Sequence, residues 1–133
     1  MNQVKNVLFL CPHAAAKSVP ALTYFADLAS QAGFEISVSN AGTEPDPTVN
    51  SAVADWLLTE GFDLTDFIPP LLTSEDLKSA DMIVSLGCIS VDEAPATADF
   101  RDWSDVPLPS AGLQASRDKI YQHVVALVSE LSA

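Results

Sequence analysis

Short runs of apolar residues recur along the chain and predict strands. Residues 4–10, VKNVLFL, are rich in β-branched and aromatic side chains, which is typical of a strand buried on both faces of a parallel sheet. Residues 34–42, FEISVSNAG, alternate apolar with polar side chains and end in glycine, which predicts a second strand. A third buried strand is predicted at 81–87, DMIVSLG, and a short fourth strand at 100–103, FRDW.

Apolar residues at helical spacing lie between these runs. A first helix is predicted to begin at Ser18, with Pro20 in its first turn, and to end at Gly33. A second helix is predicted to begin at Pro47 and to end at Gly61, with an apolar stripe that packs on the sheet.

Two further helices complete the pattern. Residues 73–80 fit a short helix capped by Thr73 or Ser74, with acidic residues in its first turn. The last helix is marked by an apolar stripe at i, i+4, i+7, i+8 and i+11, formed by Ile120, Val124, Leu127, Val128 and Leu131. The connector at 62–72 and the acidic loop at 89–99 are predicted to be irregular.

The order of these elements predicts the fold class. Strands that alternate with helices indicate an α/β fold, in which a mostly parallel sheet carries helices on both faces. At 133 residues the chain suits one domain, residues 1–133, which buries ~70% of its unfolded surface. Functional sites in such folds lie at the carboxyl ends of the strands, so the residues that follow each strand are the candidates for chemistry.

The charge balance restricts the partners. Asp and Glu number 18 against six Lys and Arg, which gives a formal net charge of −12. Binding to nucleic acid or to an anionic membrane needs clustered cations, so neither is an expected partner. Large acidic phosphoproteins are disfavoured for the same reason. A small anion remains possible where a local site overcomes the negative field of the surface.

Several absences in the sequence bear on location and cofactors. No apolar stretch approaches the ~20 residues that span a bilayer, and the first residues lack the features of a secretion signal. The two cysteines, Cys11 and Cys88, are too few for a secreted disulfide framework. We therefore expect a cytoplasmic protein. No cluster of His, Cys and Asp has metal-ligand spacing, and neither a metal nor another cofactor is expected.

The segment CPHAAAKS, residues 11–18, joins the first strand to the first helix. Such a turn points several backbone N–H groups at one place, and the helix dipole adds positive potential, which makes an anion site. Cys11, at the first position, is stabilised there as a thiolate and becomes a nucleophile at neutral pH. Lys17 is placed to pair with an oxyanion, and the Ser18 hydroxyl to hydrogen-bond the sulfur. The residues expected to surround the anion are Pro12, His13, Ala14, Ala15, Ala16 and Lys17.

The same segment has a second interpretation from the residues alone. Cysteine is among the residue types most often buried. Cys11 is equally well explained as a core side chain at the end of a strand, and Lys17 as a solvated lysine in the first turn of the helix. The segment by itself does not decide between the two interpretations.

Five motifs are spread over nearly the whole chain. They are VLFLC at 7–11, SNAGTEPDPTVNSAV at 39–53, TSEDLKSADMIVSLGC at 73–88, DWSDVPLPS at 102–110 and RDKIYQHVVALVSEL at 117–131. Together they resemble the low-molecular-weight protein tyrosine phosphatases and their relatives, the thiol-dependent arsenate reductases, and the second half is closer to the arsenate reductases. The resemblance implies a three-layer α/β/α fold with a four-stranded parallel sheet, and Cys11 as the nucleophile that attacks phosphorus or arsenic.

The loop departs from the pattern of these families at two places. Their loop arginine is Lys17 here, and an ammonium does not reproduce the planar fork that clamps two oxygens of a transition state. Their loop asparagine is replaced around His13 and Ala14. His13 is either a new neighbour of Cys11 or an exposed loop residue.

The position of a general acid is a third departure. Phosphatases of this type carry Asp-Pro in a late loop, and protonation of the leaving oxygen contributes ~10²–10⁴-fold to the rate. Alignment on Pro109 places Leu108 at the acid position, whereas alignment one step earlier makes Asp105 the candidate. Asp105 is otherwise a turn-forming acid.

Cys88 follows the third predicted strand and matches the first resolving cysteine of the arsenate reductases. Residues 89–99 contain no further cysteine, so regeneration of Cys11 depends on Cys88 alone or on an external thiol. The alternative interpretation of Cys88 is a core side chain at the end of a strand.

Three functions follow as hypotheses. The first is hydrolysis of a phosphoester through a Cys11 thiolate, with Lys17 and the loop amides around the oxyanion, Ser18 stabilising the sulfur and Asp105 as general acid. The second is thiol-dependent arsenate reduction by Cys11 with Cys88 or an external thiol. The third is a catalytically weak relative that binds an oxyanion or a partner. The expected ligands are a small oxyanion or phosphoester and a thiol reductant.

Overall fold

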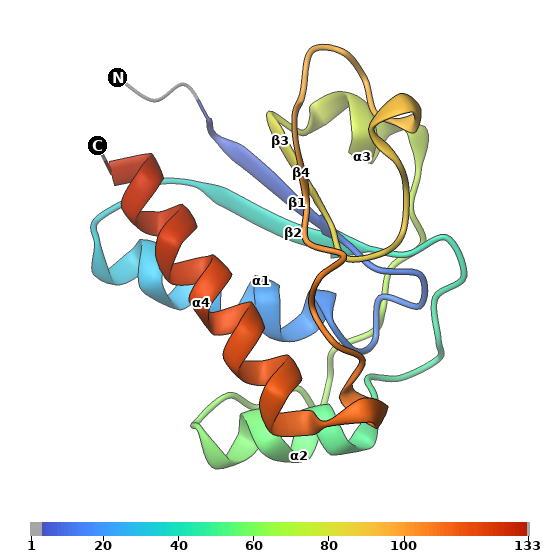
Figure 1. Cartoon of the computed structure of the whole chain (residues 1–133), viewed down its shortest axis with the longest axis vertical. Helices are drawn as coiled ribbons and strands as arrows, with labels where there is room; N and C mark the ends of the chain where they lie inside the picture. The colour runs from blue at the N-terminus through green and yellow to red at the C-terminus, as the bar shows by residue number, and fades with distance from the viewer. Residues whose placement is uncertain (1–3, 133) are drawn as a thin grey trace.

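The structure of the protein, a computed structural model, describes residues 4–132. Within those residues the strands are β1 (Asn6–Leu10), β2 (Ser37–Ala41), β3 (Met82–Ser85) and β4 (Asp99–Asp102). All neighbouring strands pair in parallel, in the order β2-β1-β3-β4 (Figure 1). The predicted α/β fold with a four-stranded parallel sheet is confirmed.

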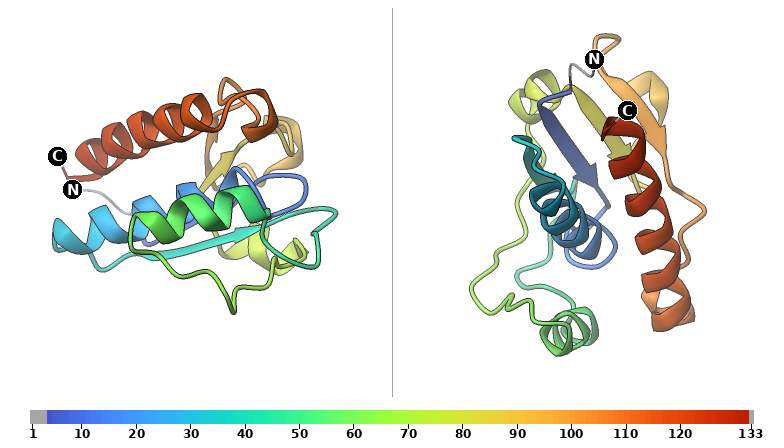
Figure 2. Two further views of the ribbon diagram at one scale, coloured as in Figure 1. Left: turned by 90° about the horizontal axis from the view of Figure 1, so that it is seen from below. Right: turned by 90° about the vertical axis from the view of Figure 1, so that its left-hand side faces the viewer.

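Helices cover both faces of the sheet. They are α1 (Ser18–Gln31), α2 (Ser51–Thr59), α3 (Ser74–Ser79) and α4 (Leu113–Ser132), with short 3₁₀ turns η1 (Val91–Glu93) and η2 (Pro109–Ala111). Phe9 points into a core shared with α1, α2 and α4, whereas its neighbours Leu8 and Leu10 point into a smaller core on the side of α3. Figure 2 shows α4 and α3 on opposite sides of the sheet. The fold therefore has three layers, with most of the helical mass on one face.

Two predicted boundaries differ from the structure by three residues or more, and the others by one or two residues. The alternating pattern begins at Phe34, but β2 begins at Ser37, where pairing with β1 starts. The second helix was predicted from Pro47 but begins at Ser51, because the Asn50 side chain accepts the N–H groups of the first turn. The residues in between run beside the loop that follows β1, and hydrogen bonds to that loop take the place of a helical turn.

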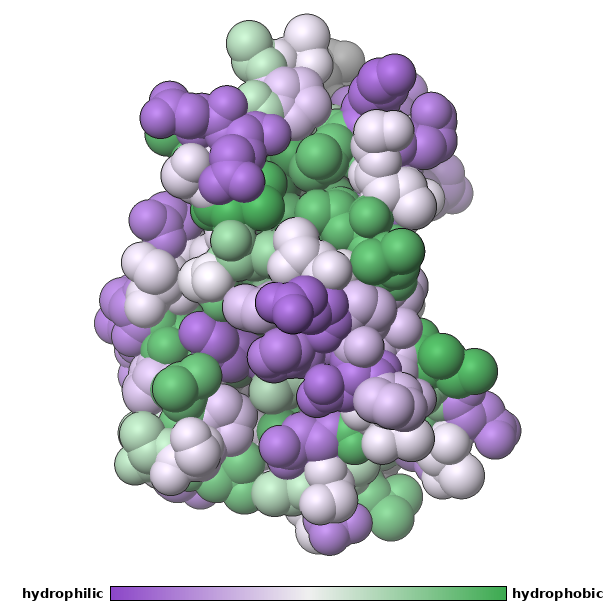
Figure 3. Space-filling model, turned by 90° about the vertical axis from the view of Figure 1, so that its right-hand side faces the viewer, coloured by the Kyte–Doolittle hydropathy of each residue, from purple (hydrophilic) through white to green (hydrophobic). Residues whose placement is uncertain are grey.

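The strand order determines where a site can form. From β1 the chain passes to β2 on one side and then to β3 on the other, so the connections diverge at the carboxyl end of β1. A crevice at such a point is the usual ligand site of an open α/β sheet. Cys11 follows β1 and Cys88 follows the adjacent strand β3 by three residues. Figure 3 shows the side of the molecule to which these loops extend, with hydrophilic residues gathered in its middle.

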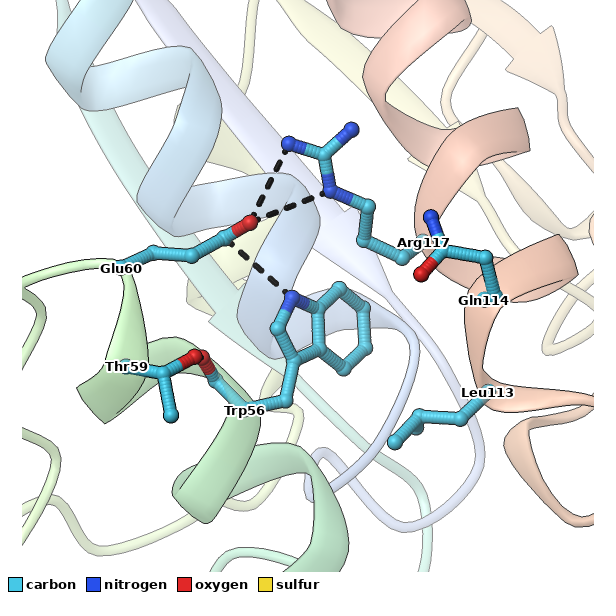
Figure 4. A pocket seen from close by; sticks show the side chains of 6 residues that line it. All are labelled: Trp56, Thr59, Glu60, Leu113, Gln114 and Arg117. Carbon is cyan, nitrogen blue, oxygen red and sulfur yellow. Dashed lines mark hydrogen bonds and ion pairs between the residues drawn. The ribbon is translucent and has the colours of Figure 1, made fainter.

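A network around Glu60 connects α1, α2 and α4. The carboxylate accepts hydrogen bonds from Arg117 Nε and Nη2, each at 3.2 Å, and from Trp56 Nε1 at 3.2 Å, as Figure 4 shows. It also accepts the hydroxyl of Tyr24, and burial together with this carboxylate raises the pKa of Tyr24 above its ordinary range. Glu60, Arg117 and Trp56 border a cavity of about 630 Å³ that Leu113 also lines. Because its charges are paired with one another, the cavity offers no free charge to a ligand.

A second ion-pair network joins β4 to α4, and its contribution to the free energy of unfolding decreases at acid pH. Arg101 donates to Asp99 and to Glu130, with N–O distances of 2.8 Å to each. Its hydrogen bonds hold the pKa of both carboxyls below their ordinary values. A carboxyl with a lowered folded pKa contributes stability above its unfolded pKa, about 3.9 for Asp and 4.3 for Glu, and this is lost as the pH falls through the folded value.

Arg101→Gln should therefore lower the free energy of unfolding by an amount that depends on pH. The difference from the wild type is expected to be constant between pH 6 and 8 and to shrink towards zero below about pH 4. Urea unfolding at a series of pH values measures it. Lys78→Gln, which removes one positive charge elsewhere, is the control for net charge, and a difference that stays constant down to pH 3 would contradict the prediction.

Candidate active site

The loop between β1 and α1 is held by its carbonyl groups. The carbonyls of Pro12, His13 and Ala15 accept hydrogen bonds from the backbone N–H groups of Glu44, Asp46 and Asn50, at 2.8, 3.0 and 2.9 Å respectively. These partners lie on the segment 43–50 between β2 and α2. Since the carbonyl of one residue and the N–H of the next point in opposite directions across a trans peptide, the outward carbonyls turn N–H groups towards the centre of the loop.

Several of these N–H groups have no acceptor. Within residues 4–132, the backbone N–H groups of His13, Ala15, Ala16 and Lys17 donate no hydrogen bond. A buried N–H without a partner is costly, and more than 90% of buried backbone donors in proteins are paired. Here the unpaired groups follow one another just before the N-terminus of α1, whose dipole also favours negative charge. The loop is therefore suited to an anion with several oxygens.

Cys11 lies at the start of this loop. Its side chain is only 3% exposed, and Sγ receives the backbone N–H of Ser18 at 3.4 Å. Sγ also lies 3.0 Å from Ser18 Oγ: a Cys11 thiol donates its S–H to this oxygen, whereas a thiolate would accept the hydroxyl proton of Ser18. Asn40, near the end of β2, donates its amide N–H to Ser18 Oγ at 3.0 Å. The sulfur thus has two donors at the N-terminus of α1.

The loop contains one strained residue. Ala14 has φ 52°, in the left-handed region, and is fully buried. This conformation costs a non-glycine residue roughly 1–2 kcal/mol. The Asn40 amide donates to the Ala14 carbonyl at 3.3 Å and so supports the turn from the side of β2.

Gly42 brings the segment after β2 against the loop. A Cβ at this position would lie 2.6 Å from the carbonyl oxygen of Pro12, 2.7 Å from that of Cys11 and 2.8 Å from the Ala14 nitrogen. On its other side Gly42 donates to the carbonyl of Pro70 at 3.0 Å. Only glycine allows this approach.

Lys17 is buried beside the end of β3. Its side chain is 8% exposed, and Nζ lies 3.4 Å from where a Cβ on Gly87 would be. Nζ makes no hydrogen bond or ion pair with residues 4–132. Nζ is not among the fully buried polar atoms of the described residues, so the ammonium keeps some contact with solvent and is available to pair with an anion in the loop.

His13 points away from the loop. Its ring is 56% exposed, with Nδ1 2.8 Å from the carbonyl oxygen of Glu44 and 3.7 Å from the carboxylate of Asp46. Of the two alternatives for this residue, the position matches an exposed loop residue.

Cys88 is held in a turn next to the loop. Ser85 Oγ receives the N–H groups of Cys88 and Ile89, each at 3.1 Å, which fixes the turn at the end of β3. Burial raises the pKa of the half-buried Cys88 thiol, and the charge of Cys11 raises it further, although hydrogen bonds from Thr43 oppose both. Cys88 therefore lies within the electrostatic field of Cys11, on the side of the segment that follows Gly42.

Asp105 is paired with α4. Its carboxylate lies 2.9 Å from His123 Nε2 and 3.3 Å from Lys119 Nζ. The ring of His123 in turn stacks on Trp103, with centroids 4.6 Å apart. Partial burial raises the pKa of Asp105, but the hydrogen bonds and charges of His123 and Lys119 outweigh it and hold the pKa below its ordinary value. A carboxyl in this state is ionised at neutral pH and has no proton to donate. Leu108, the other aligned position, is exposed.

Neither a metal cluster nor a membrane-spanning helix is found in the part of the chain that the structure describes. Residues 4–132 contain no group of three His, Cys, Asp or Glu side chains placed to hold a metal ion. None of the helices in the same range has the length and apolar character needed to cross a bilayer.

Three residues of this site were not singled out by the sequence. Asn40, Gly42 and Thr43 lie in the motif SNAGTEP, which was recognised as a whole. The contacts of Asn40 and Gly42 with the loop, and that of Thr43 with Cys88, join positions more than 20 residues apart in sequence. Of the three residues, only the glycine carries a local signal of close backbone approach.

Known proteins resemble this chain over nearly its whole length, including the site. Residues 6–132 match the model of a family described as low molecular weight phosphotyrosine protein phosphatase. A protein of Halobacterium salinarum described as a putative arsenate reductase is 30% identical over 129 residues, which cover 93% of this chain and 91% of that protein.

Solved structures share the fold at lower identity. A thioredoxin-dependent arsenate reductase of Corynebacterium glutamicum superposes with a TM-score of 0.82 at 24% identity, and the match covers 97% of this chain but only 62% of that one. A mutant of YwlE from Bacillus subtilis superposes with a TM-score of 0.84 at 18% identity, covering 97% of this chain and 99% of the other. At these identities the likeness shows the fold alone.

Proposed function

Since this chain belongs to the low molecular weight phosphotyrosine protein phosphatase family, we propose that Cys11 attacks the central atom of a tetrahedral oxyanion held in the loop at residues 11–17, and that this oxyanion is arsenate, reduced at the expense of thiols. The observation that carries the proposal is the set of unpaired backbone N–H groups of His13, Ala15, Ala16 and Lys17, together with the ammonium of Lys17. Donors fixed in advance around a developing negative charge are the largest single contribution in many enzymes.

The proposed reaction has three steps. The Cys11 thiolate forms a bond to arsenic, one As–O bond breaks, and the oxygen leaves as water after protonation. Cys88, as its thiolate, then attacks Cys11 Sγ. An S–S bond forms, the S–As bond breaks, and its electron pair reduces As(V) to As(III), which leaves as arsenite. Two equivalents of an external thiol, or one dithiol, reduce the disulfide between Cys11 and Cys88, leave as a disulfide themselves and regenerate both cysteines.

The electrostatic interaction between Cys11 and Cys88 is consistent with attack by Cys11 first and by Cys88 second. Burial is the largest cause of the raised pKa of Cys88, and a charged Cys11 adds a smaller contribution in the same direction. Once Cys11 Sγ is bonded to arsenic, that charge is lost and the contribution disappears, so the Cys88 thiolate forms more readily at the stage where it is needed.

Two observations favour arsenate over a phosphoester. Asp105, the candidate acid, is held ionised by His123 and Lys119, so an alcohol leaving group would depart without a proton donor. The relative with 30% identity is described as a putative arsenate reductase.

Phosphoester hydrolysis is the second candidate. The family description favours it, and the same loop and thiolate would serve it, with water in place of Cys88 in the second step. Without a general acid, we expect it to be restricted to esters with good leaving groups, such as p-nitrophenyl phosphate.

Arsenite formation and p-nitrophenyl phosphate hydrolysis, measured side by side with dithiothreitol present, test the proposal. We expect Cys88→Ser to lower arsenite formation by about 10-fold or more, since it removes the attacking thiol, and to leave hydrolysis within about twofold. Hydrolysis without Cys88-dependent arsenite formation would overturn the proposal in favour of the phosphatase. Tight binding of arsenate with neither reaction would favour the catalytically weak relative.

A further inference from the structure

Asn40 is a buried amide that serves the active site from a neighbouring strand. It is 5% exposed, and it pairs with Phe9 in the register of β2 and β1. Its Nδ2 donates to two acceptors, Ser18 Oγ at 3.0 Å and the Ala14 carbonyl at 3.3 Å. An amide nitrogen carries two hydrogens, so each hydrogen has one acceptor.

The bond to Ser18 determines where the serine proton points. A hydroxyl has one hydrogen to donate, and Asn40 occupies a lone pair of Ser18 Oγ because the amide nitrogen can only donate. The hydroxyl hydrogen is therefore directed away from Asn40. The remaining partner of Ser18 Oγ is Cys11 Sγ at 3.0 Å. A Cys11 thiol can donate its S–H to the other lone pair of Ser18 Oγ, whereas a Cys11 thiolate accepts the Ser18 hydroxyl proton. A hydroxyl hydrogen that Asn40 directs towards the sulfur stabilises the second arrangement and so favours the thiolate.

We propose that Asn40 is a positioning residue that sets the ionisation of Cys11 through Ser18 and, through the Ala14 carbonyl, holds the strained turn of the loop. It touches neither the sulfur nor the anion. The relay consists of the pairs Asn40–Ser18 and Ser18–Cys11, all of which are buried. The inference rests on the proposed role of Cys11 as a thiolate.

A purely structural role for Asn40 would affect stability but not ionisation. The test therefore measures the pH dependence of alkylation of Cys11 by iodoacetamide in a Cys88→Ser background, where Cys11 is the one remaining thiol. Asn40→Leu keeps the branched shape of the side chain and removes the donors. We expect its alkylation midpoint to rise by about one pH unit or more, as for Ser18→Ala. Ser39→Ala, an exposed neighbour on β2, is the control and should not move it.

The double variant tests the relay itself. If Asn40 acts through Ser18, Ser18→Ala with Asn40→Leu should lie within about 0.3 pH units of Ser18→Ala alone, because coupled residues are not additive. An unchanged midpoint in Asn40→Leu, or fully additive shifts, would overturn the inference. A wild-type midpoint near that of a free thiol would instead overturn the proposed function.

A second measurement, which does not need the Asn40→Leu variant, tests the inference if that variant does not fold. In ¹⁵N-labelled Cys88→Ser protein, the side-chain amide signals of Asn40 should shift with the same pH midpoint as Cys11 alkylation, because the Ser18 bond between them changes with the charge on sulfur. Amide signals that stay constant through that midpoint would contradict the relay.

Discussion

Cys11→Ser is expected to lower both arsenite formation and p-nitrophenyl phosphate hydrolysis by at least about 10⁴-fold. A serine hydroxyl in place of the thiol is not ionised at neutral pH, so the loop would still bind the anion but would hold no nucleophile against it. Initial rates at saturating substrate measure the loss.

Binding is the control for this variant. Arsenate should still bind to Cys11→Ser, as measured by calorimetry, because the donors of His13, Ala15, Ala16 and Lys17 are unchanged. Far-UV circular dichroism would establish that the fold is kept. Residual turnover within about 10-fold of the wild type would place the nucleophile elsewhere.

Gly42→Ala is expected to disable the site although it replaces no side chain that the proposal places against the anion. The new methyl would lie less than 3.0 Å from backbone atoms of Pro12, Cys11 and Ala14, so the loop or the segment after β2 has to move. Overpacking of this kind costs about 1–3 kcal/mol of unfolding free energy. A displacement of about 1 Å at a reacting centre costs about 10²-fold in rate. Urea unfolding and initial rates measure the two effects.

Gly61→Ala separates this collision from backbone strain. Gly61 has φ 96°, where alanine is strained, but a Cβ there meets no atom within 4 Å. It should lower stability by roughly 1 kcal/mol and leave the rates unchanged. Equal loss of activity in both variants would show that stability, and not the loop, explains the result.

The elements that could be predicted are those with local causes. The buried run of β1 and the stripe of α4 read directly from the sequence, and the three-layer arrangement followed from their order. The start of α2 could not be predicted, because residues 43–50 are bound to the loop at 11–17. The start of β2 could not be predicted either, because it depends on where pairing with β1 begins. Hydrogen bonds such as Asn50 N–H to Ala15 carbonyl join distant positions, and local propensity carries no trace of them.

The contacts of the candidate site likewise divide into local ones, which could be predicted, and long-range ones, which could not. Cys11 and Ser18 are seven residues apart on one strand–loop–helix unit, so their contact was predictable. Asn40 reaches Ser18 from another strand, 22 residues away in sequence. The pairing of Asp105 with His123 likewise depends on the packing of α4 against the end of β4. The spacing of the residues alone does not define these contacts.

The outward hydrogen bonds of the loop carbonyls have a thermodynamic consequence. Because the segment 43–50 already fixes Pro12, His13 and Ala15, the empty loop is preorganised, and an arriving anion does not have to order it. The conformational entropy of the loop backbone is lost once, when the chain folds, and no further loss occurs when an anion binds in each catalytic cycle. Folding thus supplies in advance part of the free energy that capture of a small, strongly hydrated ion requires.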